Sequence, residues 1–135
     1  MSGAGAGEQH APLTIATLTL ALGPPEHGVT RFAVECARAA GTGVLEVADV
    51  ADVAGVREVL DARPGVSVHL HVTDSLFGAT ADDAAMTVED LARGRRIGVT
   101  LHDVPQPAEG AERCRRRTRA YQRIAGAAGL VVVSS

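Results

Sequence analysis

The chain is predicted to be an α/β protein with a three-layer, Rossmann-like architecture, in which helices cover both faces of a parallel sheet of about five strands. Short runs of β-branched and aliphatic residues alternate with segments of helical periodicity along the chain. Aromatic residues make up only 2% of the sequence, so the core must consist of Val, Leu, Ile and Ala, which suits strands buried on both faces. Because 135 residues make about one domain, we expect a flexible tail over residues 1–12 and a single domain over residues 13–135.

The expected strands are apolar runs, and the segments between them have the spacing and capping residues of helices. The strands are predicted over residues 13–22, 44–48, 66–72, 97–102 and 130–133. The helices are predicted over about 30–40, 49–62, 80–92 and 111–127. We expect Thr30 to be the N-cap of the first helix and Phe32 to be buried on its inner side. Residues 80–83 resemble a capping box.

The basic residues are unusual in kind and in distribution. Apart from histidine, all thirteen are arginine, which excludes chemistry that needs a lysine, such as a P-loop or a Schiff base. Residues 1–92 hold four arginines against thirteen acidic residues, whereas residues 93–135 hold nine against three. This basic final third favours a phosphorylated ligand or an anionic membrane surface over nucleic acid.

Cysteine content and hydropathy indicate the compartment. Cys36 and Cys114 fall in expected helices without a CxxC spacing, which is typical of reduced thiols in the cytosol. The N-terminal residues lack the basic and apolar regions of a signal peptide, and no apolar run approaches about 18 residues. We therefore expect a cytoplasmic protein.

Histidines and acidic residues gather at the ends of the third and fourth expected strands. His69 and His71 point to one face of the third strand, Asp74 follows it, and His102 and Asp103 end the fourth. One interpretation is a metal site made of these five residues, as in a small metal-dependent hydrolase. The other is that His69 is a hydrogen-bonded support residue while His71 approaches a ligand crevice. Since no third ligand has a diagnostic spacing, the favoured interpretation assigns no metal and no cofactor.

Two further segments are candidates for binding anions. The loop Gly23-Pro24-Pro25-Glu26-His27-Gly28 lacks the spacing of a dinucleotide fingerprint, but it can bring backbone amides and a helix N-terminus toward an anion. The last helix is strongly basic, and a solvated face is the commonest reason for such a run. Contact with an anionic membrane or an acidic partner is the alternative, through Arg113, Arg116 and Arg123.

The order of these segments resembles a known family. A strand leads into the loop of residues 23–28 and a helix, followed by Val-His-Leu-His-Val-Thr-Asp at 68–74, Val-Thr-Leu-His-Asp-Val-Pro at 99–105, Tyr121 on a helix, and Leu-Val-Val-Val-Ser-Ser at 130–135. Together they resemble the N-terminal half of glycosyltransferases of the two-domain GT-B architecture. The resemblance is to the family-4 retaining enzymes in particular, which transfer sugars from nucleotide donors.

The resemblance implies roles for the strand-end residues. The loop that contains Gly23, Glu26, His27 and Gly28 would approach the diphosphate of the nucleotide sugar. The candidate catalytic pair, near the transferred sugar, is His102 and Asp103. The candidate substrate-binding residues are His71, Asp74 and Ser134.

The resemblance also implies that this domain does not act alone. In that family a second Rossmann-like domain, with a Glu-x7-Glu type motif, holds most of the donor nucleotide. We expect this chain to lack that domain and to be half of a split enzyme, a truncated remnant, an isolated domain or a fold reused for binding. Transfer of sugar to an acceptor, which the sequence does not name, would need the donor domain, in trans in the case of a split enzyme. The alternatives are a non-catalytic interaction module and the metal-dependent hydrolase described above.

Overall fold

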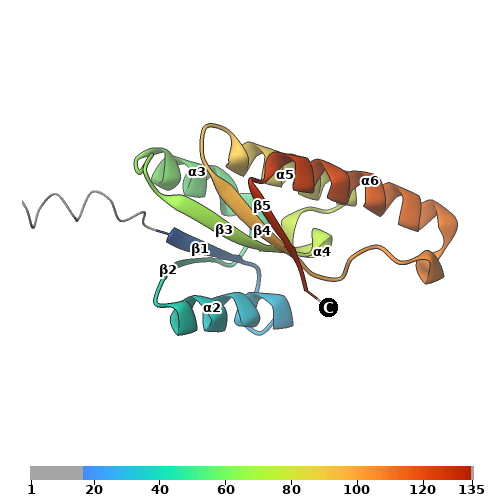
Figure 1. Ribbon diagram of the computed structural model, residues 1–135, viewed down its shortest axis with the longest axis horizontal. Helices are drawn as coiled ribbons and strands as arrows, with labels where there is room; N and C mark the ends of the chain where they lie inside the picture. Colours follow the sequence, from blue (N-terminus) through green and yellow to red (C-terminus); the bar gives the residue numbers. More distant parts are fainter. Residues whose placement is uncertain (1–16, 135) are drawn as a thin grey trace, which may run out of the picture.

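Five strands lie parallel in the order β2-β1-β3-β4-β5 in the computed structural model, which describes residues 17–134 (Figure 1). The fold class is therefore confirmed as a three-layer, Rossmann-like α/β domain. The expected tail and the first residues of the first expected strand lie outside the described residues. The strands are β1 Thr17–Leu22, β2 Gly43–Val47, β3 Ser67–Val72, β4 Ile97–Leu101 and β5 Leu130–Val133.

The helices lie on both faces of the sheet, with α2 on one face and α3, α5 and α6 on the other (Figure 1). Right-handed crossovers explain this division, because the chain moves from β1 to β2 in one direction and from β2 onward in the opposite direction. The helices are α2 Gly28–Ala40, α3 Val53–Asp61, the short α4 Asp74–Phe77, α5 Ala81–Ala92 and α6 Ala111–Ala127. Two 3-10 turns cover Val50–Asp52 and Pro107–Glu109. No helix of the described residues is long and apolar enough to cross a membrane.

The two helical layers enclose cores of different size. The main core fills the space between the sheet and α3, α5 and α6, where aliphatic side chains surround Phe77. The second core, under α2, consists of Ala21, Ala33 and Val34. Since α2 packs on β1, β2 and β3, no helix of the described residues covers the same face of β4 and β5. Leu130 and Val132 point to this uncovered face, while Val131 and Val133 point to the α6 face. All four side chains are exposed, because β5 is also the edge of the sheet.

Local hydrogen bonds decide where the helices begin. The predicted N-cap of the first helix is wrong, because α2 begins at Gly28 and the Nδ1 atom of His27 accepts a hydrogen bond from the amide of Val29. Thr30 is buried instead, and its hydroxyl donates to the carbonyl of Leu22. The predicted cap at Thr80 is confirmed, since its hydroxyl accepts from the amide of Asp83.

The turn after β1 depends on Gly23, which has a φ of 116°. A Cβ atom at this position would lie 2.7 Å from Leu76 Cδ2 and 2.9 Å from Thr30 Oγ1. The absence of a side chain therefore lets the loop pass close to α4 and to the start of α2.

Gly23→Ala is expected to lower the free energy of unfolding by about 1–3 kcal/mol, because alanine is strained at this φ and crowds two neighbours. Gly28→Ala is the matched control, because no atom lies within 4 Å of its would-be Cβ. Urea denaturation followed by circular dichroism measures both. An equal loss of stability in the two variants would contradict this account of the turn.

Candidate functional site

Three histidines lie side by side on the α2 face of the sheet, near its carboxyl edge. We call His69, His71 and His102 the histidine row. The Nδ1 atom of His71 lies 3.1 Å from Nε2 of His102, and Nε2 of His69 lies 2.8 Å from the Thr100 hydroxyl. The ring centroids of His69 and His71 are 5.1 Å apart. The row adjoins the point between β1 and β3 where the strand order reverses, which is where open α/β sheets bind ligands.

The histidine row is held in its neutral form. Burial lowers the pKa of His71 to about 4, and the neighbouring His69 and His102 lower it further in the same direction. Burial also lowers the pKa of His69 and that of His102. One imidazole of the His71–His102 pair must donate its proton to the other ring, which is the arrangement of two neutral rings. At neutral pH these side chains therefore offer hydrogen bonds without charge.

Glycine at position 98 gives the row its room. A Cβ atom on Gly98 of β4 would lie 3.0 Å from Nδ1 of His69. The His69 ring can therefore lie across β4 and reach Thr100. The expectation that His69 is the deep residue and His71 the open one is reversed, because His71 is 7% exposed and His69 is only partly buried.

Phe32 covers one end of the row. The prediction that α2 buries this residue is wrong, since Phe32 is 46% exposed. Its ring meets those of His71 and His102 edge to face, with both centroid distances 5.6 Å. Phe32 therefore shields the inner imidazoles from one side and presents its other side to solvent.

A pocket of about 300 Å³ lies between the start of α2 and the ends of β4 and β5. It brings together several candidates from distant parts of the sequence. Its lining is His27, Gly28, Val29, Phe32, His102 and Ser134. We call it the histidine pocket, and none of these described residues carries a carboxylate or a guanidinium. Among the other loop candidates, Gly23 is buried behind the turn and Glu26 is exposed to solvent, and neither lines the pocket.

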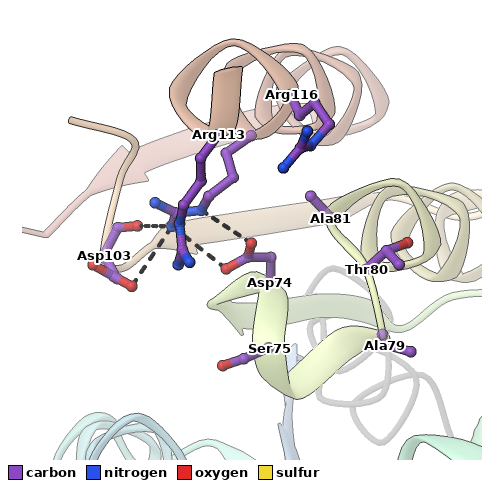
Figure 2. Close-up of a pocket in the computed structure, with 10 residues that line it drawn as sticks. Asp74, Ser75, Ala79, Thr80, Ala81, Asp103, Arg113 and Arg116 are labelled. Atoms are coloured by element: carbon purple, nitrogen blue, oxygen red, sulfur yellow. Dashed lines mark hydrogen bonds and ion pairs between the residues drawn. The ribbon is translucent and has the colours of Figure 1, made fainter. Parts of the chain in front are cut away.

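The candidate carboxylates lie on the opposite side of the sheet. Asp74 starts α4 and faces Arg117 of α6, with 3.0 Å between its Oδ2 atom and the arginine Nε. The Oδ2 atom of Asp103 lies 3.6 Å from Nη2 of the same arginine. Dashed lines in Figure 2 mark the interactions that join Asp74 and Asp103 to the guanidinium between them. The structure thus separates the predicted cluster of histidines and carboxylates into two sites.

Arg117 is the centre of an ion-pair network, and its side chain is only 4% exposed. Its Nη1 atom donates to both carboxylate oxygens of Glu109, at 2.8 and 2.6 Å, and its Nη2 atom donates to the Asp103 carbonyl. Burial alone would lower the pKa of Arg117, but the hydrogen bonds that it donates to Asp74 and Glu109 outweigh burial and raise the pKa. The guanidinium therefore stays charged.

Tyr121 extends this network to the end of β4. Its hydroxyl lies 3.2 Å from the carbonyl of His102 and 3.4 Å from that of Asp103. Burial raises the pKa of this phenol, and the negative charge of Asp74 raises it further. Asp103 has a φ of 50°, which is uncommon for a residue with a side chain. The contacts to Arg117 and Tyr121 hold it there, so they also fix the backbone from which the His102 side chain projects.

A second cleft lies beside this network and is the one that Figure 2 shows. Its volume is about 420 Å³, and Arg113 and Arg116 of α6 lie across it from the α4–α5 loop, which contains Thr80. Both arginines are more than half exposed, but each has an acidic neighbour: Glu109 of the preceding 3-10 turn for Arg113, and Glu112 of α6 for Arg116. Arg123, the third candidate for membrane contact, is bound to Glu89 of α5 at 2.6 Å.

The described residues hold no group of three or more His, Cys, Asp or Glu side chains placed to bind a metal ion. The separation of Asp74 and Asp103 from the histidine row explains this finding. The geometry therefore gives the metal-dependent hydrolase no support among these residues.

Sequence analysis missed two residues that shape the site. Arg117 was expected on a solvated face, yet it lies three residues after Cys114 and four before Tyr121, on the inner stripe of α6. Phe32 was expected in the core and instead contacts the imidazoles. Helical spacing was a signal for Arg117, whereas no signal in the sequence distinguishes a core phenylalanine from one at a pocket.

Acid is expected to destabilise the fold through His71. Its pKa in the folded state is about 4, below the 6.5 of an unfolded chain, so the unfolded state binds the proton first as pH falls. Between pH 7 and pH 4 this loss is on the order of 3 kcal/mol. His71→Gln should remove that part of the pH dependence, as measured by urea unfolding at several pH values. Identical pH slopes for wild type and variant would refute it.

Removing the buried arginine is expected to cost much more stability than removing an exposed one. Arg117→Met leaves Asp74 and Glu109 without their cation and should lower the free energy of unfolding by about 3–5 kcal/mol. Arg119→Met is the control on the exposed side of the same helix, and it should change stability by no more than about 0.5 kcal/mol. Thermal and urea unfolding compare the two, and similar losses would mean that the network is not stabilising.

The chain matches no protein-family model, no curated protein and no solved structure.

Proposed function

We propose that this domain is the acceptor-side domain of a glycosyltransferase, which transfers sugar from a nucleotide-sugar donor once a donor-binding domain completes the site. The observation that carries the proposal is the histidine pocket. It joins His27 and Gly28 from the loop after β1, His102 from the end of β4, and Ser134 from the end of β5. These residues belong to the segments on which the resemblance to family-4 enzymes depends.

The chemistry of the pocket suits a sugar that brings its own phosphate charge. The N-terminus of α2 opens beside it, with Gly28 as its first residue, so backbone amides can approach an anion without a side chain in the way. The pKa of His102 is lowered by burial, so its imidazole is available in neutral form for a hydrogen bond to a sugar hydroxyl. Phe32 adds an apolar ring surface.

The proposal includes the need for a second domain. In the GT-B architecture the donor nucleotide is held mainly by that domain, and transfer takes place in the cleft between the two. This chain supplies one wall of such a cleft. We therefore propose that it binds the sugar end of the donor weakly and has no transferase activity alone.

Contact of α6 with an anionic membrane stays a prediction. Arg113 and Arg116 are exposed, while Arg123 is engaged by Glu89. An acceptor carried on a lipid would bring the domain to such a surface. Flotation with anionic vesicles, with and without charge reversal at Arg116 and Arg119, distinguishes this contact from a solvated face.

Titration of the full chain with a panel of nucleotide sugars is expected to shift the NMR signals of His27, Gly28 and His102 more than others. His102→Ala should weaken binding by up to about tenfold, because a hydrogen bond between neutral groups is worth about 0.5–1.5 kcal/mol. Gln122→Ala, on the exposed side of α6, is the control. Shifts confined to the cleft at Arg113 and Arg116, or no shifts with any donor, would argue against this assignment.

A further inference from the structure

We propose that two copies of this chain associate edge to edge through β5 and form one continuous sheet. The β5 edge adjoins the histidine pocket through Ser134, but the proposal does not depend on the proposed function. Four features of the described residues support it. The side chains of β5 are exposed and aliphatic, the opposite edge of the sheet carries a charge, few charged side chains lie near β5, and the strand can pair with a copy of itself.

Strand β5 is an exposed apolar edge. Its side chains are all aliphatic, and the exposed fractions of Leu130, Val131, Val132 and Val133 are 59%, 39%, 45% and 58%. It pairs with β4 on one side, and no strand of the described residues pairs with it on the other. An edge strand of this kind presents unpaired backbone donors and acceptors to another chain.

The opposite edge of the same sheet is protected. Strand β2 carries an exposed Glu46, and its other large side chains are at least partly buried, with Val47 at 8% exposure. Charge on an edge strand is a common means of preventing pairing with a second sheet. Only the β5 edge lacks such a charge among the described strands, so the two edges differ in what they can bind.

The surroundings of β5 are also largely uncharged. The side of α6 turned away from α5 carries Thr118 and Ala125, which line a shallow cleft with Val104 and Pro105. On the α2 face the nearest exposed ring is Phe32. Arg96 is the exception, because it lines the same surface hollow as Leu130, at the amino-terminal ends of β4 and β5. Antiparallel pairing sets the two copies of Arg96 at opposite ends of the shared edge. Two identical surfaces of this composition approach without charge repulsion, although each chain has a net charge of −3.

A second copy is the occupant that this edge fits by symmetry. A two-fold interface requires a surface that is complementary to itself, and a neutral strand of four aliphatic residues meets that requirement in antiparallel pairing. If the two-fold axis is perpendicular to the sheet and passes near Val131, Leu130 of one copy lies opposite Val132 of the other. These two side chains then point to the same face of the combined sheet. Antiparallel pairing also turns the two carboxyl edges away from each other, so both histidine pockets stay open.

The test is the mass of the full chain in solution, measured by light scattering and sedimentation over a wide range of concentration. The expected result is a reversible dimer with twice the 13.9 kDa mass of one chain. Val132→Lys should raise the dissociation constant tenfold or more. Val59→Lys on α3 is the matched control, because Val59 is 46% exposed and Val132 is 45% exposed. Circular dichroism checks that both variants fold, and Leu130→Glu replaces Val132→Lys if that variant does not.

A mixing experiment tests the geometry of the contact. Val131 lies at the proposed axis and faces its own copy, so Val131→Lys and Val131→Glu should each dimerise weakly alone. An equal mixture should recover association, because opposite charges then face each other across the edge. A wild-type chain that is monomeric at every concentration would overturn the proposal. So would a dimer that Val132→Lys weakens no more than Val59→Lys does, or a failure of the mixture to recover association.

Discussion

The structure around the site depends on the burial of one guanidinium. Taking Arg117 out of water costs several kcal/mol, and only a complete set of partners offsets that cost. Asp74 comes from the end of β3, Glu109 from the loop after β4, and the Asp103 carbonyl from the same loop. One side chain of α6 therefore fixes the relative positions of the segments that follow two neighbouring strands.

This network also determines the chemistry of the other face. Arg117 holds Asp74 and Asp103 on the α6 side of the sheet. Among the described residues, the histidine row therefore has no carboxylate as a hydrogen-bond partner. Without one, nothing opposes the effect of burial on the imidazoles, and the pKa of each falls, that of His71 also through its two histidine neighbours. The result is a neutral pocket on one face and an ionic network on the other. A pocket of this kind disfavours a cationic ligand, because such a ligand would find no counter-ion there.

Much of the fold could be predicted from the sequence, and the site only in part. Apart from the start of the first strand, which lies outside the described residues, the strands were predicted within one residue of their observed ends, because each is a run rich in β-branched and aliphatic residues. The joint histidine–carboxylate cluster failed because adjacent residues such as His102 and Asp103 leave a strand in opposite directions. Arg117 was missed because only apolar residues were counted on the inner stripe of α6, and a buried arginine shows itself only through partners distant in sequence.

The open part of the sheet follows from topology and not from composition. With right-handed crossovers, each step from β2 to β5 places its helix on one face, so the single step from β1 to β2 leaves α2 alone on the other. The α2 face of β4 and β5 therefore stays uncovered in the described domain, whatever residues it carries. This explains why His69 pairs with Thr100 there, since a polar pair tolerates water where an aliphatic pair would not. The same topology puts the histidine pocket beside the start of α2 and leaves β5 free at the edge, so the two proposed binding surfaces have one structural origin.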